Sequence, residues 1–180
     1  MKLNGEIAIT GKNVAKLPIA VKQIIAGKVT ALLKQYKDTM LQFKPNELIT
    51  KFFDQGDAVV LLEKKTNQLI GFGKNKLWIG KNEYGRKVYE FGSWIVNKKF
   101  QHKGYGHYLA RLTTQTLKKK DPNAQLIAVC DLNSKKAIEI LKQLGAIEIP
   151  KPKNVNILLG EGKTKCVIID MSNINWNNNL

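Results

Sequence analysis

Apolar and polar residues along the chain form runs that predict strands and helices in a mixed order. Strands are predicted where apolar residues alternate with polar ones or form short runs bounded by turn residues. They fall at residues 6–10, 58–63, 69–79, 87–96, 125–131, 155–159 and 165–171. Helices are predicted where apolar residues recur every three or four positions. They cover residues 18–36, 45–53, 105–120 and 133–146.

The pattern also predicts which residues face the core and how the strands are joined. In the first long helix, one apolar face is formed by Val21, Ile24, Ile25, Val29, Leu32, Leu33 and Tyr36, with lysines expected opposite. In the helix that begins at Tyr105, one side presents Tyr105, Leu109, Leu112 and Thr116. Short turns join the three strands between residues 58 and 96, so these strands are expected to be antiparallel. A closing hairpin is expected from residues 155–159 and 165–171.

Length and composition favour one soluble domain. The chain has 180 residues, of which 43% are hydrophobic, and this is enough for a single substantial core. We expect one domain over residues 1–172 and a loose tail over residues 173–180. No apolar run approaches a membrane span, so a cytoplasmic protein is expected, as a monomer or a homodimer. Cys130 and Cys166 lie in apolar strands and are predicted to be buried thiols, and no metal site is expected.

The formal net charge of +16 comes almost entirely from lysine. Only Arg86 and Arg111 are arginines, and asparagine and isoleucine are abundant, as AT-rich coding would produce. Solvated lysines are therefore the favoured interpretation, and a surface for nucleic acid or another polyanion is the less favoured one. The residues that would form such a surface are Lys22, Lys28 and Lys34 on the first long helix.

The stretch from Val96 to Ala110 predicts an anion site, because it reads as a strand end, a glycine-bearing turn and a helix start. The first N–H groups of a helix have no intrahelical partner, and the helix dipole favours negative charge there. Gly104 and Gly106 have no Cβ and leave the backbone amides accessible. Three lysines, Lys98, Lys99 and Lys103, add positive charge around the turn.

Two better-known phosphate loops do not fit the sequence. The dinucleotide-binding fingerprint needs a third glycine where this chain has Leu109, and strands and helices do not alternate before it. The run Gly162-Lys163-Thr164 has the end of a P-loop motif, but Ile157 stands where the first glycine is required. A hairpin turn explains that second run better.

The remaining motif, Gln-x-x-Gly-x-Gly from Gln101 to Gly106, resembles the acyl-CoA pyrophosphate loop of the GNAT superfamily of N-acyltransferases. Its context strengthens the resemblance, because a strand precedes the loop and a helix, a second apolar strand and the helix 133–146 with its closing glycine follow it. The resemblance covers about residues 58–171. It implies an α/β (α+β) fold with a mixed, mostly antiparallel central sheet, helices on both faces and a V-shaped splay between the fourth and fifth main strands.

The resemblance also implies the cofactor, acetyl-CoA, and a set of cofactor-binding residues. In this family the pantetheine enters the splay and pairs with exposed backbone groups, as an added strand would. Carried over by position, the residues on the strand are Trp94, Ile95 and Val96, with backbone donors at Trp94 and Val96. The loop residues around the pyrophosphate are Gln101, His102, Lys103, Gly104, Tyr105, Gly106 and His107. The other arm of the cofactor is expected near Asn133 or Ser134.

Acetyl transfer to an amine needs a base, because the amine is protonated at neutral pH and must lose a proton before it attacks the thioester. Glu90 is the candidate. It lies on the face of Gly92 and Trp94 and takes the position of the general-base glutamate in histone-type members of the family. The alternative is a structural glutamate that pairs with a lysine on a half-exposed sheet face.

The chain departs from the family at the position of the general acid. Many members carry a tyrosine that reprotonates the leaving thiolate, and the corresponding residue here is Leu141. Water or another tyrosine, such as Tyr105, remains as a substitute.

The sequence leaves three functions open. The favoured one is an N-acetyltransferase that acts on a primary amine of a small molecule or a protein. The others are a CoA-binding module without turnover and a basic, nucleic-acid-associated protein on the same scaffold.

Overall fold

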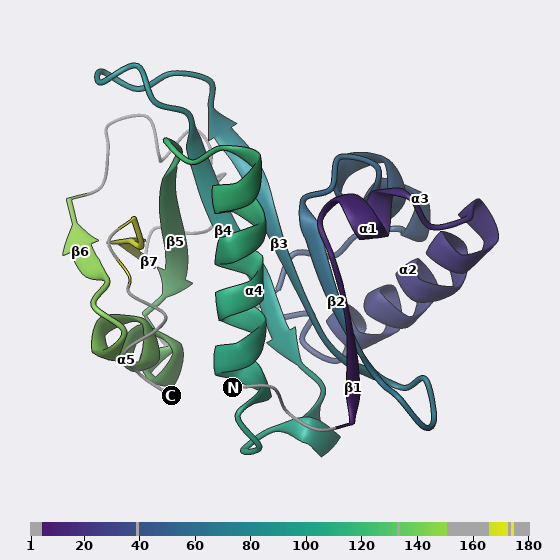
Figure 1. The fold of residues 1–180 in the computed structure, drawn as a ribbon. Helices are drawn as coiled ribbons and strands as arrows, with labels where there is room; N and C mark the ends of the chain where they lie inside the picture. The colour runs from purple at the N-terminus through teal and green to yellow at the C-terminus, as the bar shows by residue number, and fades with distance from the viewer. Residues whose placement is uncertain (1–4, 39, 133, 151–165, 173, 175–180) are drawn as a thin grey trace. The chain divides into compact units, whose positions relative to one another are not determined.

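The computed structural model describes residues 5–38, 40–132, 134–150, 166–172 and 174. The strands form a seven-stranded sheet in the order β1-β2-β3-β4-β5-β7-β6 (Figure 1). The chain divides into two compact units, Met1–Lys76 with Gly92–Pro122, and Leu77–Phe91 with Asn123–Leu180. The expected single domain over residues 1–172 stays a prediction. Of the expected tail, Ile174 is described and is buried, and residues 173 and 175–180 lie outside the described residues.

The first unit contains most of the helices that the structure describes. Its elements are β1 (Glu6–Thr10), α1 (Lys12–Ala15), α2 (Ile19–Lys34), α3 (Pro45–Leu48), a π-helical turn (Ile49–Phe53), β2 (Ala58–Glu63), the first part of β3 (Leu69–Ile79), the end of β4 (Val88–Val96), a 3-10 turn (Lys98–Phe100) and α4 (Tyr105–Lys120). β1 and β2 are antiparallel, as are β2 and β3. The predicted strands 6–10, 58–63 and 69–79 are therefore confirmed.

Alternate residues of β2 divide the core of this unit between two helix layers. Val59 and Leu61 pack with Leu109 of α4. Val60 and Leu62 belong to a second cluster, which includes Val29 and other buried residues of α2. A strand places successive side chains on opposite faces, so the period-two pattern of β2 accounts for helices on both sides of the sheet.

Two glycines let α4 lie close to β3 in this unit (Figure 1). A Cβ atom built on Gly73 would be 2.3 Å from Thr113 Oγ1, and one on Gly71 would be 3.1 Å from Leu109 Cδ2. Side chains of α4 therefore occupy the space that a side chain on either glycine of β3 would need. The side predicted for this helix is only partly right, because Thr113 and Thr114 are fully buried while Leu112 is half-buried.

The predicted core face of α2 is wrong at its N-terminal end. Val21 and Ile24 are exposed, by 37% and 60%, whereas Lys22 is only 8% exposed. The Lys22 ammonium lies 2.6 Å from the Asp54 carboxylate, which follows the π-helical turn. The aliphatic stem of lysine packs like an apolar side chain once its charge is paired. The ion pair with Asp54 therefore turns Lys22, and not Ile24, inward.

The second unit holds the parallel part of the sheet. It contains the end of β3, the first part of β4, β5 (Gln125–Asp131), α5 (Lys135–Gln143), β6 (Ile147–Ile149) and β7 (Cys166–Asp170). β4 and β5 run parallel from the pair Val88 and Gln125 to the pair Phe91 and Ala128. The mixed, mostly antiparallel sheet is confirmed, and the splay between its fourth and fifth strands stays a prediction.

Of the expected closing hairpin, the structure describes only the second strand, β7. β7 pairs with β5 and with the short strand β6, antiparallel in both cases. β6 was not predicted, and residues 155–159 lie outside the described residues. Cys130 in β5 is half-buried, not fully buried as predicted, and the Cys166 side chain is outside the description. Within the described residues, no helix is long and apolar enough to cross a membrane, and no His, Cys, Asp and Glu residues cluster as a metal site.

Candidate functional site

The end of β4 has an unusual backbone conformation. Ser93 has a φ of +46°, which non-glycine residues rarely adopt. Beyond it, Trp94 and Val96 pack on the α4 side of the first unit, while Ile95 belongs to the cluster on the α2 side. The next residue, Asn97, is held by β3, because its backbone N–H donates to Ile70 O at 2.8 Å. The predicted cofactor-binding strand is thus fixed at its end.

The loop after β4 begins with a short 3-10 turn. The Asn97 side-chain oxygen accepts a hydrogen bond from the backbone N–H of Lys99 at 3.2 Å, and so caps this turn. Gln101 is extended, His102 has a φ of +60°, and Gly104 has a φ of +80°. Gly104 is where a left-handed residue is needed at the helix start, which explains the first glycine of the motif. His102 also has a positive φ, although it lacks the conformational freedom of glycine.

Helix α4 begins at Tyr105 without a side-chain cap. Its N-cap is Gly104, whose carbonyl accepts a hydrogen bond from the Tyr108 N–H at 3.2 Å. The N–H groups of Tyr105, Gly106 and His107 precede the first intrahelical donor and have no partner inside the helix. The first turn carries no acidic residue. This end of a sixteen-residue helix therefore presents N–H donors and a positive dipole end to an anion.

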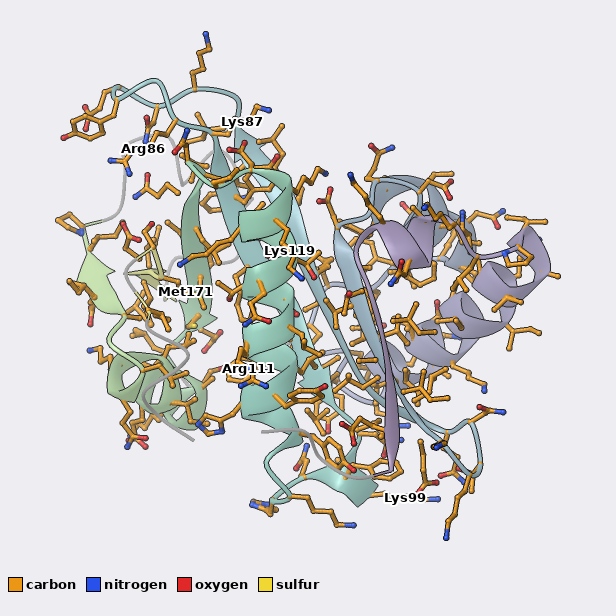
Figure 2. All side chains as sticks on the ribbon, in the orientation of Figure 1. Arg86, Lys87, Lys99, Arg111, Lys119 and Met171 are labelled. Carbon is orange, nitrogen blue, oxygen red and sulfur yellow. The ribbon has the colours of Figure 1, made fainter. Side chains whose placement is uncertain are left out.

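Lysines surround this helix start. Lys98, Lys99 and Lys103 are exposed, and Figure 2 shows Lys99 at the end of α4 that carries the loop and Lys119 nearer the other end. The Lys103 ammonium lies 5.7 Å from the centre of the Phe100 ring, and the Lys98 ammonium lies 5.8 Å from the centre of the Tyr36 ring. Both ammonium groups rest over aromatic faces, which attract cations, and both remain near the loop.

Trp94 ties the strand end to the start of α4. Its indole N–H donates to Gly106 O at 2.9 Å. A Cβ atom on Gly106 would be 3.7 Å from the Trp94 ring, an ordinary contact distance, so the second glycine of the motif is not required by packing against Trp94. The predicted residues Trp94 and Gly106 are thus brought together.

The Gln101 side chain is directed toward β4. Its amide donates to Val96 O at 3.1 Å and to the Tyr36 hydroxyl at 3.0 Å. The sequence assigned Gln101 to the surroundings of the pyrophosphate, and the structure gives its side chain two partners within the protein. Tyr36 is a residue near the loop that the sequence reasoning missed, because its spacing placed it on the apolar face of α2.

Tyr105 is half-buried and packs against the first unit's cluster on the α4 side. Its ring meets the Phe100 ring edge-on, with the ring centres 6.1 Å apart. Burial raises the pKa of Tyr105 above its ordinary value of 10.0, and the negative charges of Glu6 and Glu63 raise the pKa further. The hydroxyl therefore stays protonated at neutral pH and keeps a proton to donate.

The remaining predicted residues lie in the second unit. Glu90 is half-buried on β4 between the buried side chains of Tyr89 and Phe91, and it is opposite Ile127 in the parallel register. Ser134 precedes α5, and its N–H donates to Asp131 O at 2.8 Å. Asn133 lies outside the described residues. Leu141, which stands at the usual tyrosine position, is only 1% exposed and therefore serves the core.

The lysines proposed as a polyanion surface are partly engaged within the chain. Lys22 pairs with Asp54, and the Lys28 ammonium donates to Asn67 O at 2.7 Å. Of the three lysines named from the sequence, only Lys34 keeps the solvated position on α2 that such a surface needs. The alternative function, association with nucleic acid, therefore gains no support from the lysines of α2.

A family model supplies the deciding comparison. The model of the acetyltransferase (GNAT) family matches residues 29–146, which include β2, β3, β4, the loop, α4 and α5. The chain belongs to the GNAT acetyltransferase family. It therefore has the fold of the acyl-CoA-dependent N-acetyltransferases. No curated protein sequence matches this acetyltransferase significantly.

Solved structures of other acetyltransferases share the fold. Arabidopsis thaliana Naa50, in complex with a bisubstrate analogue of CoA, is 13% identical, with 92% of this chain and 97% of that chain covered and a TM-score of 0.63. Arabidopsis thaliana NAA60 with acetyl-CoA is 12% identical, with 80% and 92% covered and a TM-score of 0.59. A GNAT acetyltransferase from Bacillus anthracis is 15% identical, with 94% and 95% covered and a TM-score of 0.59. At these identities the likeness concerns the fold alone.

Proposed function

We propose that this acetyltransferase moves an acetyl group from acetyl-CoA to a primary amine of a small molecule or a protein. The observation that carries the proposal is the uncapped start of α4 behind Gly104, with its N–H donors and nearby lysines. Such a cradle fits a pyrophosphate, because backbone N–H groups, the helix dipole and cationic side chains all favour negative charge at one place. Acetyl-CoA, when bound, supplies the acetyl thioester.

The chain's own residues then have distinct roles. The N–H groups of residues 102–107 hold the pyrophosphate, and the ammonium groups of Lys98 and Lys103 neutralise its charge. The backbone of Trp94 and Val96 pairs with the pantetheine arm, while Val96 O already has donors in Gln101 and Tyr36. The strand end therefore offers N–H donors rather than this carbonyl to the cofactor. Ser134 is proposed for the other arm of the cofactor.

Glu90 is the proposed general base. An ammonium ion has no lone pair for attack on a carbonyl, so its proton must first pass to a base. The Glu90 carboxylate takes this proton directly or through a water molecule, and the neutral amine then attacks the thioester carbon. As the carbon–sulfur bond breaks, the thiolate of CoA leaves and the nitrogen gives its second proton to water, which leaves a neutral amide. Water or the Tyr105 hydroxyl is the proposed source of the proton that it finally takes, since Leu141 carries none.

The test is acetyl transfer to a panel of small amines and peptides, with release of CoA followed by chromatography. The wild-type protein is expected to release CoA in the presence of at least one amine. Glu90→Gln is expected to lower turnover by about 100-fold or more while the Kd for acetyl-CoA stays the same. Glu83→Gln, which changes an exposed glutamate in the turn before β4, is the matched control and keeps full activity.

Two results would contradict the proposal. Binding of acetyl-CoA without turnover on any amine would favour a CoA-binding module. Full activity of Glu90→Gln across the pH range would return Glu90 to a structural role and leave the base unassigned.

A further inference from the structure

Two groups at the start of the loop and one from a distant part of the sequence form a closed ring of hydrogen bonds. The Gln101 amide donates to the Tyr36 hydroxyl at 3.0 Å and to Val96 O at 3.1 Å. The Tyr36 hydroxyl in turn lies 3.4 Å from Val96 O and donates to it. Tyr36 lies two residues beyond the end of α2, 60 positions before Val96 and 65 before Gln101. All three residues belong to the first unit.

The ring fixes the peptide at which β4 gives way to the loop. Val96 O accepts two donors, which satisfies both lone pairs of a carbonyl oxygen. The orientation of the peptide between Val96 and Asn97 is therefore held from the side of α2. Gln101, the second member, is the first residue of the glycine motif, and His102 with its positive φ follows it directly. A change at Tyr36 thus acts on the backbone that presents N–H groups to the anion.

The Tyr36 ring has a second contact with the loop. The Lys98 ammonium lies 5.8 Å from the ring centre, so the tyrosine holds one of the cations near the helix start. The Tyr36 hydroxyl contacts Val96 O, whereas the aromatic ring of Tyr36 contacts the Lys98 ammonium. A phenylalanine in place of Tyr36 removes only the first contact, whereas a leucine removes both.

We propose that Tyr36 is a positioning residue for cofactor binding: through Gln101 and Val96 O it holds the loop in the conformation that receives the pyrophosphate. The proposal rests on the proposed function, since it assumes acetyl-CoA at this loop. Tyr36 itself does not touch the reacting atoms. Its loss therefore weakens acetyl-CoA binding and leaves the chemical step intact.

The test compares Tyr36→Phe and Gln101→Ala with the wild-type protein by calorimetric titration with acetyl-CoA. One hydrogen bond of this kind is worth about a factor of 3 to 10 in affinity, so Tyr36→Phe is expected to raise the Kd by that factor. Its kcat at saturating acetyl-CoA is expected to stay within about twofold of wild type. Tyr36→Leu is expected to bind more weakly than Tyr36→Phe. Tyr84→Phe, at an exposed tyrosine, is the control and keeps the wild-type Kd.

A double-mutant cycle separates the effect of the hydrogen-bond ring on affinity from the effect of a general loss of packing. Once Gln101→Ala has opened the ring, the further change Tyr36→Phe is expected to cost less affinity than it does in the wild-type background. An unchanged Kd for Tyr36→Phe, or a lower melting temperature with no change in Kd, would overturn the positioning role alone. If wild-type protein does not bind acetyl-CoA at all, the proposed function fails, and this inference fails with it.

Discussion

Gly73 is the residue at which the packing of α4 on β3 can be tested most sharply. A methyl group at this position would lie 2.3 Å from Thr113 Oγ1, 3.4 Å from Thr113 Cβ and 3.5 Å from Leu109 Cδ1. Only the first of these distances is a clash. Thr113 is fully buried, and its hydroxyl donates to Leu109 O at 2.8 Å. Gly73→Ala therefore forces Thr113 to rotate and lose this bond, or forces the helix away from the strand.

The expected cost follows from these contacts. Overpacking of a well-packed core costs about 1 to 3 kcal/mol. Alanine recovers about 0.4 to 1 kcal/mol by restricting the unfolded chain, because Gly73 does not have a positive φ. We expect a net loss of about 1 to 2 kcal/mol in the free energy of unfolding. For a chain of this length, the melting temperature should fall by roughly 2 to 8 °C.

The assay is equilibrium unfolding in urea of Gly73→Ala, Thr113→Ala and the double variant. Thr113→Ala removes Oγ1, and the methyl group added at position 73 then meets only ordinary contacts. The double variant is expected to be more stable than the sum of the single effects predicts, by about 1 kcal/mol. Gly80→Ala, where a Cβ meets nothing within 4 Å and φ is not positive, is the control and should be unchanged or more stable by about 0.4 to 1 kcal/mol. A neutral Gly73→Ala, or strict additivity with Thr113→Ala, would refute the close approach of α4 to β3.

Two further predictions concern charged groups of the first unit. Asp54→Asn leaves the Lys22 ammonium without its counter-charge, and the Lys22 side chain is only 10% exposed. Lys22→Met instead keeps an apolar side chain of similar length and removes the charge. Urea unfolding should therefore show the Asp54→Asn variant to be less stable than the Lys22→Met variant. The backbone N–H of Lys44 and the ammonium of Lys51 lower the pKa of Glu47 below 4.5, so this carboxylate stabilises the fold above that pH and loses its effect as the pH falls through its lowered pKa. Thermal scans should therefore show wild type more stable than Glu47→Gln near pH 7, with a difference that shrinks as the pH falls below 4.5, and a constant difference would contradict this.

Local patterns were sufficient to predict the strands and the loop. β2 and β3 begin and end where the sequence places them, because apolar runs end at the turn between residues 64 and 68. Gly104 was identified as a residue of the loop because a residue without Cβ leaves the amides of a helix start accessible, and the structure adds that its φ is positive. The strand β6 was missed because three residues between Ala146 and Pro150 are too few for a period to emerge.

Contacts between distant residues decided what the sequence could not predict. The N-terminal end of α2 has apolar residues beyond its core face, such as Val21 and Ile24, and there the pairing of Lys22 with Asp54 decides which residues turn inward. The direction of the Gln101 side chain depends on Tyr36, which is 65 positions away. The positive φ of Ser93 carries no sequence signal, because serine is not among the residues that favour this conformation.

The central claim is that acetyl-CoA binds at the start of α4, and titration calorimetry of two glycine variants tests it most directly. Gly104→Asp places a carboxylate where the pyrophosphate is proposed to lie, and Gly85→Asp makes the same change in the turn before β4. The two glycines have φ values of +80° and +72°, so the strain of the substitution is matched. Wild type and Gly85→Asp are expected to bind acetyl-CoA with the same Kd. The carboxylate introduced at position 104 would repel the negatively charged pyrophosphate, so Gly104→Asp should bind acetyl-CoA more weakly by about 100-fold or more. Equal binding by a folded Gly104→Asp variant would contradict the claim.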